Sequence, residues 1–271
     1  MVITWHRRPE LRKTLARNAE WLRATAGYVV ATPGEDNDEL RAWLRDTGGN
    51  AGIVSAHGAF GCAKYANLGI GFTPFDAPLI FVLDADIVMA ATEVSDMVAA
   101  TSADRAVILH EVHDEPALAP LPGTDQLGIV ATRDSIFTLR LPDGRQVSVT
   151  KARQNYVSGA YLGPGMIMVG KDMLTEVGGY RSAFRSWGWE DIDLLIRLKL
   201  AGYEIGEAGR AAHLTHGDDV RNLPAGTAKM TSERDNEARG VSHLLRGETV
   251  GTLAEDIAAA VDTVRVDTVS D

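Results

Sequence analysis

Short apolar runs alternate with amphipathic segments through the first 110 residues, and this alternation constrains the fold more than any other feature of the sequence. The apolar runs predict strands at 1–5, 28–32, 53–55, 79–83 and 106–110. The segments with a helical period predict helices at 9–25, 38–46, 60–70 and 95–101. Residues 79–83 are apolar at every position, which is typical of a strand covered on both faces. Strands that alternate with helices predict an α/β fold, with a doubly wound, mostly parallel, Rossmann-like sheet flanked by helices. Ligands of such sheets bind at the carboxyl ends of the strands.

The rest of the chain has a different pattern. Two alternating runs within residues 134–150 surround Pro142-Asp143-Gly144 and predict a β-hairpin. Residues 217–240 are polar without an apolar period and predict a loop, whereas residues 252–261 predict a final amphipathic helix. We therefore expect one domain at 1–240, with parts at 1–110, 111–216 and 217–240, and a helical tail at 241–271 that could contact a second copy in a homo-oligomer.

The overall charge and the single cysteine narrow the possible partners. The formal net charge is −10, which argues against non-specific binding of nucleic acid or anionic lipid, because both need basic patches. Cys62 is the one cysteine, which excludes an internal disulfide framework. The chain opens on MVITW without a basic leader, and no stretch approaches the roughly 18 apolar residues of a membrane helix. We expect a cytoplasmic protein without an integral membrane segment.

Two carboxylates follow the apolar strand at 79–83. Asp84 and Asp86 are two residues apart, so in an extended chain their side chains point the same way where the strand leaves the sheet. Such a pair suits a divalent cation and a phosphate ligand at the carboxyl edge. A solvated turn at the strand end is the alternative interpretation.

Two histidines form a second signal. His213 and His216 are three residues apart and can converge on one ion if the backbone turns between them. Imidazole combined with carboxylate fits Mn²⁺ better than Mg²⁺, which prefers oxygen ligands. Either histidine alone is equally an ordinary hydrogen-bonded polar residue.

The start of a predicted helix carries three carboxylates. Asp191 lies at the amino end of the apolar stripe, whereas Asp193 and Arg197 lie off it and read as an exposed pair. The helix dipole favours the ionised form of Asp191, and helix chemistry alone could explain the acidic turn. Trp187 and Trp189, just upstream, are suited to form a wall for a ligand.

Two further segments carry polar or permissive residues. Lys64 and Asn67 lie three residues apart on one predicted helical turn. The segment at 161–180 contains glycines, Gly165 among them, that permit close approach of a ligand. None of these glycines fits a dinucleotide-binding fingerprint or a phosphate-binding P-loop.

These pieces, taken in order, carry a resemblance. The series LDAD, GPGMIMVGKDMLTEVGGY, WGWEDIDLLIRLKLAGY and HLTH resembles the glycosyltransferases of the GT-A fold. The pattern EDxDLxxRxxxxGY is similar to family 2 enzymes, and the glycine-rich segment with its WGW-ED turn is similar to the carboxyl-terminal module shared by β-1,4-galactosyltransferases and polypeptide N-acetylgalactosaminyltransferases. The resemblance covers residues 1–216.

The resemblance implies a metal-dependent transfer of a sugar from a nucleoside diphosphate to an acceptor hydroxyl. It implies Mn²⁺ or Mg²⁺ held by Asp86, His216 and His213, with Asp84 at the ribose or the metal. Asp191 would be the base of an inverting enzyme. The donor would be a UDP-hexose or UDP-N-acetylhexosamine, and the acceptor a small molecule, a glycan or a peptide.

The resemblance also assigns roles around the donor and the acceptor. Residues implied for donor binding are Thr4, His6, Arg7, Lys64, Asn67 and Gly165 in addition to Asp84. Trp187, Trp189 and Glu190 would contact the acceptor, and Glu190 would also be a catalytic residue beside Asp191. Residues 217–240 are a candidate lid that donor and metal would order through His216.

Two departures and two alternatives stay open. Family 2 enzymes often carry Asp-Asp-Gly-Ser after the second strand, but residues 31–34 here read Ala-Thr-Pro-Gly, which leaves the base of the nucleotide undecided. The acidic turn reads WEDID, which favours inversion without establishing it. The alternatives are a non-catalytic nucleotide-sugar binding protein and a sugar nucleotidyltransferase.

Overall fold

A mixed β-sheet forms the centre of the computed structural model, which describes residues 1–6, 9–34, 37–115, 132–184, 186–217 and 228–269. The sheet order within these residues is β11-β3-β2-β1-β4-β9-β6-β10-β5, and β7 and β8 extend from β9 as a ribbon. The strands are β1 (Val2–Thr4), β2 (Tyr28–Pro33), β3 (Ala51–Ala56), β4 (Leu79–Asp84), β5 (Ile87–Val88), β6 (Arg105–Glu115), β7 (Thr132–Arg140), β8 (Gln146–Asn155), β9 (Tyr161–Gly170), β10 (Glu204–Leu214) and β11 (Arg265–Val269). The helices are α1 (Glu10–Ala24), α2 (Asp38–Thr47), α3 (Cys62–Phe72), α4 (Ala91–Ala100), α5 (Lys171–Glu176), α6 (Glu190–Leu200), α7 (Lys229–Leu245) and α8 (Leu253–Ala260).

The strands and helices predicted in the first 110 residues are confirmed, with ends displaced by a few residues. Strands β3, β2, β1 and β4 are parallel neighbours, as an alternating pattern requires. In this register Thr4 lies opposite Asp84. Both side chains therefore stand at the carboxyl edge of the sheet.

The second half of the sheet is mixed, which corrects the expectation of a mostly parallel sheet. Strand β9 is antiparallel to both β4 and β6, because the chain returns through the β7–β8 ribbon before it enters the sheet. The predicted hairpin is confirmed as β7 and β8. Its turn is closed by the Leu141 N–H, which donates to the Arg145 carbonyl at 2.8 Å.

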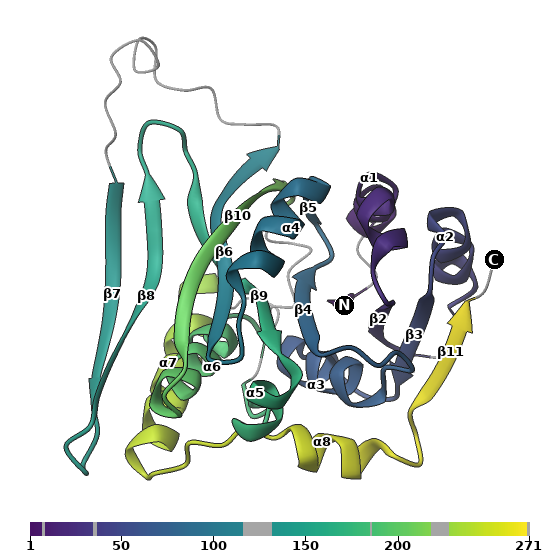
Figure 1. Ribbon diagram of the computed structural model, residues 1–271. Coiled ribbons are helices and arrows are strands. Elements are labelled where there is room, and N and C mark those ends of the chain that lie inside the picture. Colours follow the sequence, from purple (N-terminus) through teal and green to yellow (C-terminus); the bar gives the residue numbers. More distant parts are fainter. Residues whose placement is uncertain (7–8, 35–36, 116–131, 185, 218–227, 270–271) are drawn as a thin grey trace.

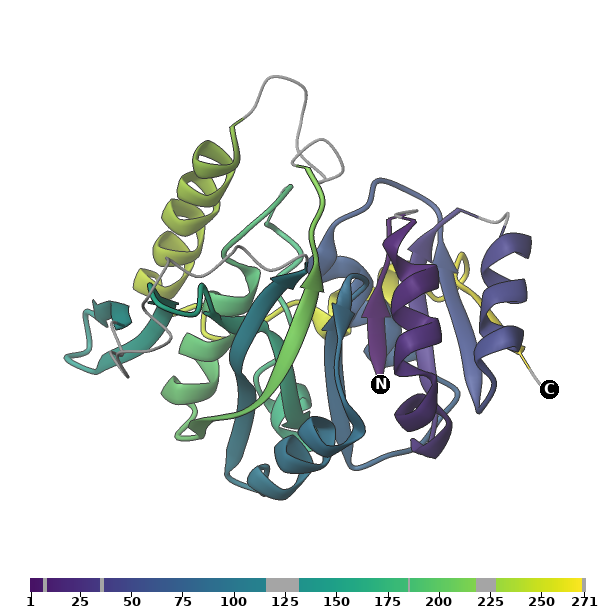
Figure 2. The same cartoon turned by 90° about the horizontal axis from the view of Figure 1, so that it is seen from above.

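Helices cover both faces of the sheet. Figures 1 and 2 show α1, α2 and α4 on one face and α3, α5, α6 and α8 on the other. Neighbouring residues of one strand accordingly enter different apolar layers: Val2 belongs to the layer that includes α3 and α6, and Ile3 belongs to the layer that includes α1 and α2. Burial on both faces explains why the strands read as continuous apolar runs.

The expected boundaries differ from the structure at three places. The division at residue 110 falls inside β6, and the division at 241 falls inside α7. Of the predicted lid, residues 218–227 lie outside the described residues, whereas 229–240 are helical. The helix at 252–261 is confirmed as α8, but the tail is not all helical, because β11 pairs antiparallel with β3 at the sheet edge.

Among the described helices, none combines the length and the apolar character that a bilayer crossing requires.

The pair formed by Asp193 and Arg197 is buried, so the expectation of an exposed pair is wrong. Both side chains are fully buried, and the Arg197 Nε donates to Asp193 Oδ2 at 2.7 Å. The Arg197 Nη1 donates to the Val177 carbonyl at 2.6 Å, and the Arg181 Nε lies 3.6 Å from Asp193 Oδ1. The apolar stripe of α6 predicts exposure for Asp193 and Arg197 because both lie off it. In the folded protein the segment at 177–181 packs against that side of α6 and covers them.

Replacing Asp193 by alanine is expected to lower the free energy of unfolding by about 3–5 kcal/mol, since two buried guanidinium groups lose their shared carboxylate. Urea unfolding measures this loss. The matched control is Glu204→Ala, which removes the exposed ion pair with Arg105 and should cost at most about 1 kcal/mol. Equal losses for the two variants would contradict the burial argument.

Candidate functional site

Backbone pairing brings two distant segments together at the carboxyl edge. After β4, the chain turns through residues 85–86 into β5, and β5 pairs antiparallel with β10, with Ile87 opposite His213. The Leu214 N–H donates to the Asp86 carbonyl at 2.8 Å. This pairing carries the two histidines to the aspartate across 130 positions of sequence.

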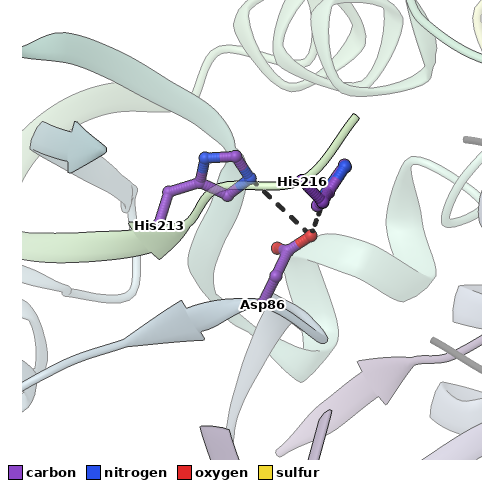
Figure 3. Close-up of side chains that lie close together, drawn as sticks. All are labelled: Asp86, His213 and His216. Carbon is purple, nitrogen blue, oxygen red and sulfur yellow. Dashed lines mark hydrogen bonds and ion pairs between the residues drawn. The ribbon is translucent and has the colours of Figure 1, made fainter. Parts of the chain in front are cut away.

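Asp86, His213 and His216 converge (Figure 3). The His216 Nε2 lies 3.0 Å from Asp86 Oδ2, and the His213 Nε2 lies 3.7 Å from the same oxygen. One ligand atom from each residue falls within 4.8 Å of the others. A carboxylate with two imidazoles is a donor set that suits Mn²⁺ and related transition metals. Their role as ligands stays a prediction.

A second carboxylate orients His213. Asp114, near the end of β6, lies 2.8 Å from His213 Nδ1, and the Tyr161 hydroxyl donates to the same Asp114 oxygen at 3.3 Å. Burial opposes the charged imidazole, but the contacts with Asp86 and Asp114 outweigh it and raise the pKa of His213. With Asp114 at Nδ1, the Nε2 atom is directed at Asp86, which is the arrangement typical of metal-ligating histidines. Asp114 is not among the predicted site residues, because the apolar run that predicts this strand ends at His110.

The acidic turn before α6 has an unusual backbone. Ser186, Gly188 and Trp189 have positive φ angles of 68°, 95° and 78°. Glu190 and Asp191 follow as the first residues of α6. Asp191 Oδ1 accepts a hydrogen bond of 2.8 Å from the Ile192 N–H, and a Cβ on Gly165 would lie 3.6 Å from Asp191 Oδ2. Gly165 of β9 therefore lies directly beside the carboxylate, at a distance where a methyl group would make an ordinary van der Waals contact.

The two carboxylates of this turn are hard to ionise together. Burial, the neighbouring Asp191 and the nearby Asp84 raise the pKa of Glu190 to about 8. Burial also raises the pKa of Asp191, although the Ile192 N–H works in the opposite direction. The helix dipole thus does not dominate at Asp191, contrary to the sequence-based expectation, because desolvation of the carboxylate is the larger effect.

A change of pH tests the unusual state of Glu190. A carboxyl whose pKa is raised on folding binds more protons in the folded than in the unfolded state, so its contribution to stability is complete below its ordinary pKa and is lost as pH rises through about 8. We compare the melting temperatures of wild type and Glu190→Gln at each pH. The difference, wild type minus variant, should fall by several degrees between pH 5 and pH 9, since 1 kcal/mol corresponds to roughly 2–4 °C for a chain of this size. Parallel melting curves would refute the raised pKa.

Asp84 is the last residue of β4, and in the antiparallel pairing with β9, in which Val82 faces Ile167, it lies at the same strand end as Gly165, the neighbour of Asp191. Its charge contributes to the raised pKa of Glu190 on one side and of Tyr161, the partner of Asp114, on the other. It also acts on the buried Tyr180, which responds to Asp191 as well. The candidate metal group and the acidic turn therefore share one edge of the sheet.

Two predicted site residues are structural, which corrects their assignments. Asn67 is fully buried, and its amide is used inside the protein: Nδ2 donates to the Tyr180 carbonyl and to Asp256, and Oδ1 accepts from the Tyr180 N–H. The Asn67 side chain is therefore not accessible to a nucleotide-sugar donor. Trp189 is 2% exposed and packs edge-on against Phe137, so it is a core residue and not a wall for an acceptor.

Other predicted residues lie near the edge. His6 is exposed and stacks on Phe60 with ring centroids 4.8 Å apart. Lys64 is half-buried, and its Nζ lies 3.9 Å from the place of a Cβ on Gly58, in the loop before α3. Trp187 is half-buried, with Lys229 Nζ 4.2 Å from its ring centroid. Arg7 lies outside the described residues. Donor and acceptor roles for the edge residues stay predictions.

Sequence comparison assigns one segment of the chain. The family described as the N-terminal domain of galactosyltransferase matches residues 144–217, which include β9, the acidic turn and both histidines. No curated protein matches the sequence at a significant level.

Structural comparison covers more of the chain. A crystal structure of GalNAc-T7 with UDP, GalNAc and Mn²⁺ matches 89% of this chain with a TM-score of 0.58 and 16% identity. The chain has a GT-A fold. It spans 47% of the GalNAc-T7 chain, so the likeness concerns the fold alone.

Two Drosophila structures are more distant from this GT-A chain. A mutant β-1,4-galactosyltransferase 7 with manganese, UDP-Gal and xylobiose has 14% identity and a TM-score of 0.45, and covers 85% of this chain and 77% of its own. The catalytic domain of the same enzyme with xylobiose has 15% identity and a TM-score of 0.44, and covers 87% and 80%. TM-scores below 0.5 do not establish a shared fold.

Proposed function

We propose that the chain is a metal-dependent glycosyltransferase that moves a sugar from a UDP-sugar to an acceptor hydroxyl with inversion. The observation that carries this proposal is the common edge. Asp86 follows the end of β4, and Asp191 lies beside Gly165 of β9, the antiparallel neighbour of β4, so the Asp86–His213–His216 group and the acidic turn face one region. The GT-A fold and the galactosyltransferase-family segment support the same reaction class.

The residues of the metal group fit a divalent cation. Asp86, His213 and His216 would hold it, with Asp114 keeping His213 in the ligating tautomer. Bound Mn²⁺ supplies positive charge that offsets the charge developing on the departing diphosphate. This explains how a chain of net charge −10 accommodates a polyanionic donor. The UDP-sugar assignment rests on the structural neighbour that carries UDP and Mn²⁺.

Asp191 serves as the base. The acceptor oxygen forms a bond to the anomeric carbon, the bond from that carbon to the diphosphate breaks with its electron pair leaving on the phosphate, and the hydroxyl proton passes to Asp191. A raised pKa suits this role, because a base is most effective when its pKa approaches the working pH. Direct attack by the acceptor from the face opposite the diphosphate inverts the anomeric centre.

Glu190 complements the base. Its pKa of about 8 leaves it protonated at neutral pH, so it can donate a hydrogen bond to a sugar hydroxyl of donor or acceptor. A proton on Glu190 also removes a negative charge next to Asp191, which allows Asp191 to ionise. Half-buried Trp187 offers an apolar ring to an acceptor sugar.

A ligand panel tests the function. Thermal unfolding is followed with nucleoside diphosphates and UDP-sugars, each with and without Mn²⁺. We expect UDP-sugars with Mn²⁺ to raise the melting temperature by roughly 5–10 °C at a hundredfold excess over Kd, because a ligand that binds only the folded state stabilises it. Release of UDP in the presence of hydroxyl acceptors then establishes transfer.

The same panel separates the alternatives. Stabilisation without release of UDP across the acceptors would indicate a nucleotide-sugar binding protein. Formation of a nucleotide sugar from a nucleoside triphosphate and a sugar phosphate would indicate a nucleotidyltransferase. Absence of any Mn²⁺-dependent stabilisation would contradict the metal-dependent reaction.

A further inference from the structure

Helix α7 presents a stripe of small and polar residues to the acidic turn. Ser232, Asn236 and Gly240 recur every fourth residue, which places them on one face of the helix, and all three are buried. Leu244 continues the stripe and is fully buried. An apolar stripe would suffice to pack a helix, so buried polar residues at these positions require another explanation.

Both polar residues bind the backbone of the turn. Ser232 Oγ accepts a hydrogen bond of 3.1 Å from the Trp187 N–H and donates one of 2.8 Å to the Trp187 carbonyl. Asn236 Nδ2 donates to the Gly188 carbonyl at 2.9 Å and to the Trp187 carbonyl at 3.4 Å. Two helix residues thus bind backbone groups of two successive residues of the turn, Trp187 and Gly188.

Gly240 completes the contact. A Cβ at this position would lie 2.4 Å from Nε1 and 2.8 Å from Cδ1 of Trp189. Only glycine lets the helix approach the indole this closely. The buried Trp189 ring, which directly precedes Glu190, is therefore held between α7 and Phe137 of β7.

Helix α7 is also attached to strand β8. The Lys151 Nζ of β8 lies 2.9 Å from Glu233 Oε1 and 3.0 Å from Glu237 Oε2. These two glutamates each follow a residue of the stripe by one position and so lie together on one side of it. The helix is thereby tied to the β7–β8 ribbon as well as to the turn, so it can serve as a fixed support.

The turn needs such a support because its backbone is unfavourable. Ser186 and Trp189 have positive φ without being glycine, and such conformations cost of order 1–3 kcal/mol and persist only when the surroundings enforce them. The N-cap residue of α6, Trp189, makes no capping hydrogen bond with its side chain. The direction of the first turn of α6, and with it of Asp191, depends on residues outside the turn.

We propose that Ser232 and Asn236 are positioning residues that hold the turn at 186–189 so that Asp191 is aimed at the acceptor. The proposal rests on the proposed function, in which Asp191 is the base. It predicts that loss of either side chain impairs transfer through Asp191 while donor and metal binding persist.

The test compares Asn236→Ala and Ser232→Ala with the matched control Asp235→Ala, an exposed position on the same helix. We expect kcat to fall by about 10–100-fold in the first two variants, because a displacement of order 1 Å of a reacting group can cost this much. The KM for the nucleotide-sugar donor and the Kd for Mn²⁺ should change by less than about twofold, because the substitutions leave the residues that bind donor and metal in place. Ser232→Thr, which keeps the hydroxyl, should restore much of the rate.

A double variant separates positioning from general support. In the Asp191→Asn background, Asn236→Ala should cause no further loss, since a residue acting through Asp191 has nothing left to orient. An additional loss of the same factor in that background would overturn the proposal, as would a wild-type kcat for Asn236→Ala. If Asn236→Ala does not fold, Ser232→Ala is judged by the same two criteria.

Amide hydrogen exchange distinguishes this inference from the proposed function. Faster exchange at 187–193 in Ser232→Ala and Asn236→Ala, with the sheet unchanged, supports the hold on the turn whatever reaction the protein performs. Unchanged exchange there overturns it. Full activity of Asp191→Asn would reject Asp191 as the base. Hydrogen exchange would then still test whether Ser232 and Asn236 hold the turn.

Discussion

Asp191→Asn is expected to lower the rate of transfer by at least about 100-fold, because general-base assistance contributes roughly 10²–10⁴-fold. The amide keeps the size of the side chain and can still accept from the Ile192 N–H through its oxygen, so the turn should persist. What is lost is the ability to take the proton of the attacking hydroxyl. The effect should appear in kcat and kcat/KM together, since the lost interaction belongs to the transition state.

Donor binding provides the internal control for Asp191→Asn. The stabilisation by UDP-sugar with Mn²⁺ should match wild type, because Asp191 belongs to the acidic turn and not to the metal group. Asp172→Asn, at an exposed carboxylate in the first turn of α5, should leave the rate unchanged. Transfer at the wild-type rate by Asp191→Asn would remove this residue from the base role.

Asp86→Ala is expected to abolish Mn²⁺-dependent stabilisation and to reduce transfer by roughly 10²–10³-fold, because the charge stabilisation that a metal supplies amounts to several kcal/mol. Asp86 Oδ2 is the oxygen nearest to both histidines, 3.0 Å from His216 Nε2 and 3.7 Å from His213 Nε2. Without it, two neutral imidazoles remain, and the donor set loses its negative charge. Calorimetric titration with Mn²⁺ measures the loss of affinity directly, and chelation of wild type should reproduce the loss of activity.

Two comparisons guard the interpretation of Asp86→Ala. Asp96→Ala, an exposed carboxylate on α4, should bind Mn²⁺ like wild type. His216→Ala should weaken Mn²⁺ binding while leaving the Asp114–His213 contact in place. If Asp86→Ala retained wild-type affinity for Mn²⁺, the cation would have to bind elsewhere and the metal group would be misassigned.

The elements of the first half could be read from the sequence because their signals are local. Alternation between apolar strands and amphipathic helices needs only the period of the side chains along the chain, and β1 to β4 with α1 to α3 followed it. The same holds for the β7–β8 hairpin, whose turn residues lie next to its two strands. Helix α7 was missed because its buried stripe is made of Ser232, Asn236 and Gly240, which no apolar period reveals.

The candidate site could be assembled only in part. Asp84 and Asp86 were placed by the end of an apolar strand, and the histidines by their spacing and by resemblance. Asp114 went unnoticed, because its link to His213 depends on the parallel pairing of β6 and β10. Asn67 was misjudged because its partners, Tyr180 and Asp256, are 113 and 189 positions away.

The amino-acid order was enough to place the secondary structure, the carboxylates at a strand end and the acidic start of a helix, because each depends on neighbours within a few positions. Only the tertiary structure brings Asp86 to His216 across 130 positions and buries Asp193 with Arg197. It also raises the pKa of Glu190 to about 8, through burial and the neighbouring Asp191. Desolvation and charge coupling act through distances in space, and those distances are set by how β5 pairs with β10 and by how the segment at 177–181 packs on α6.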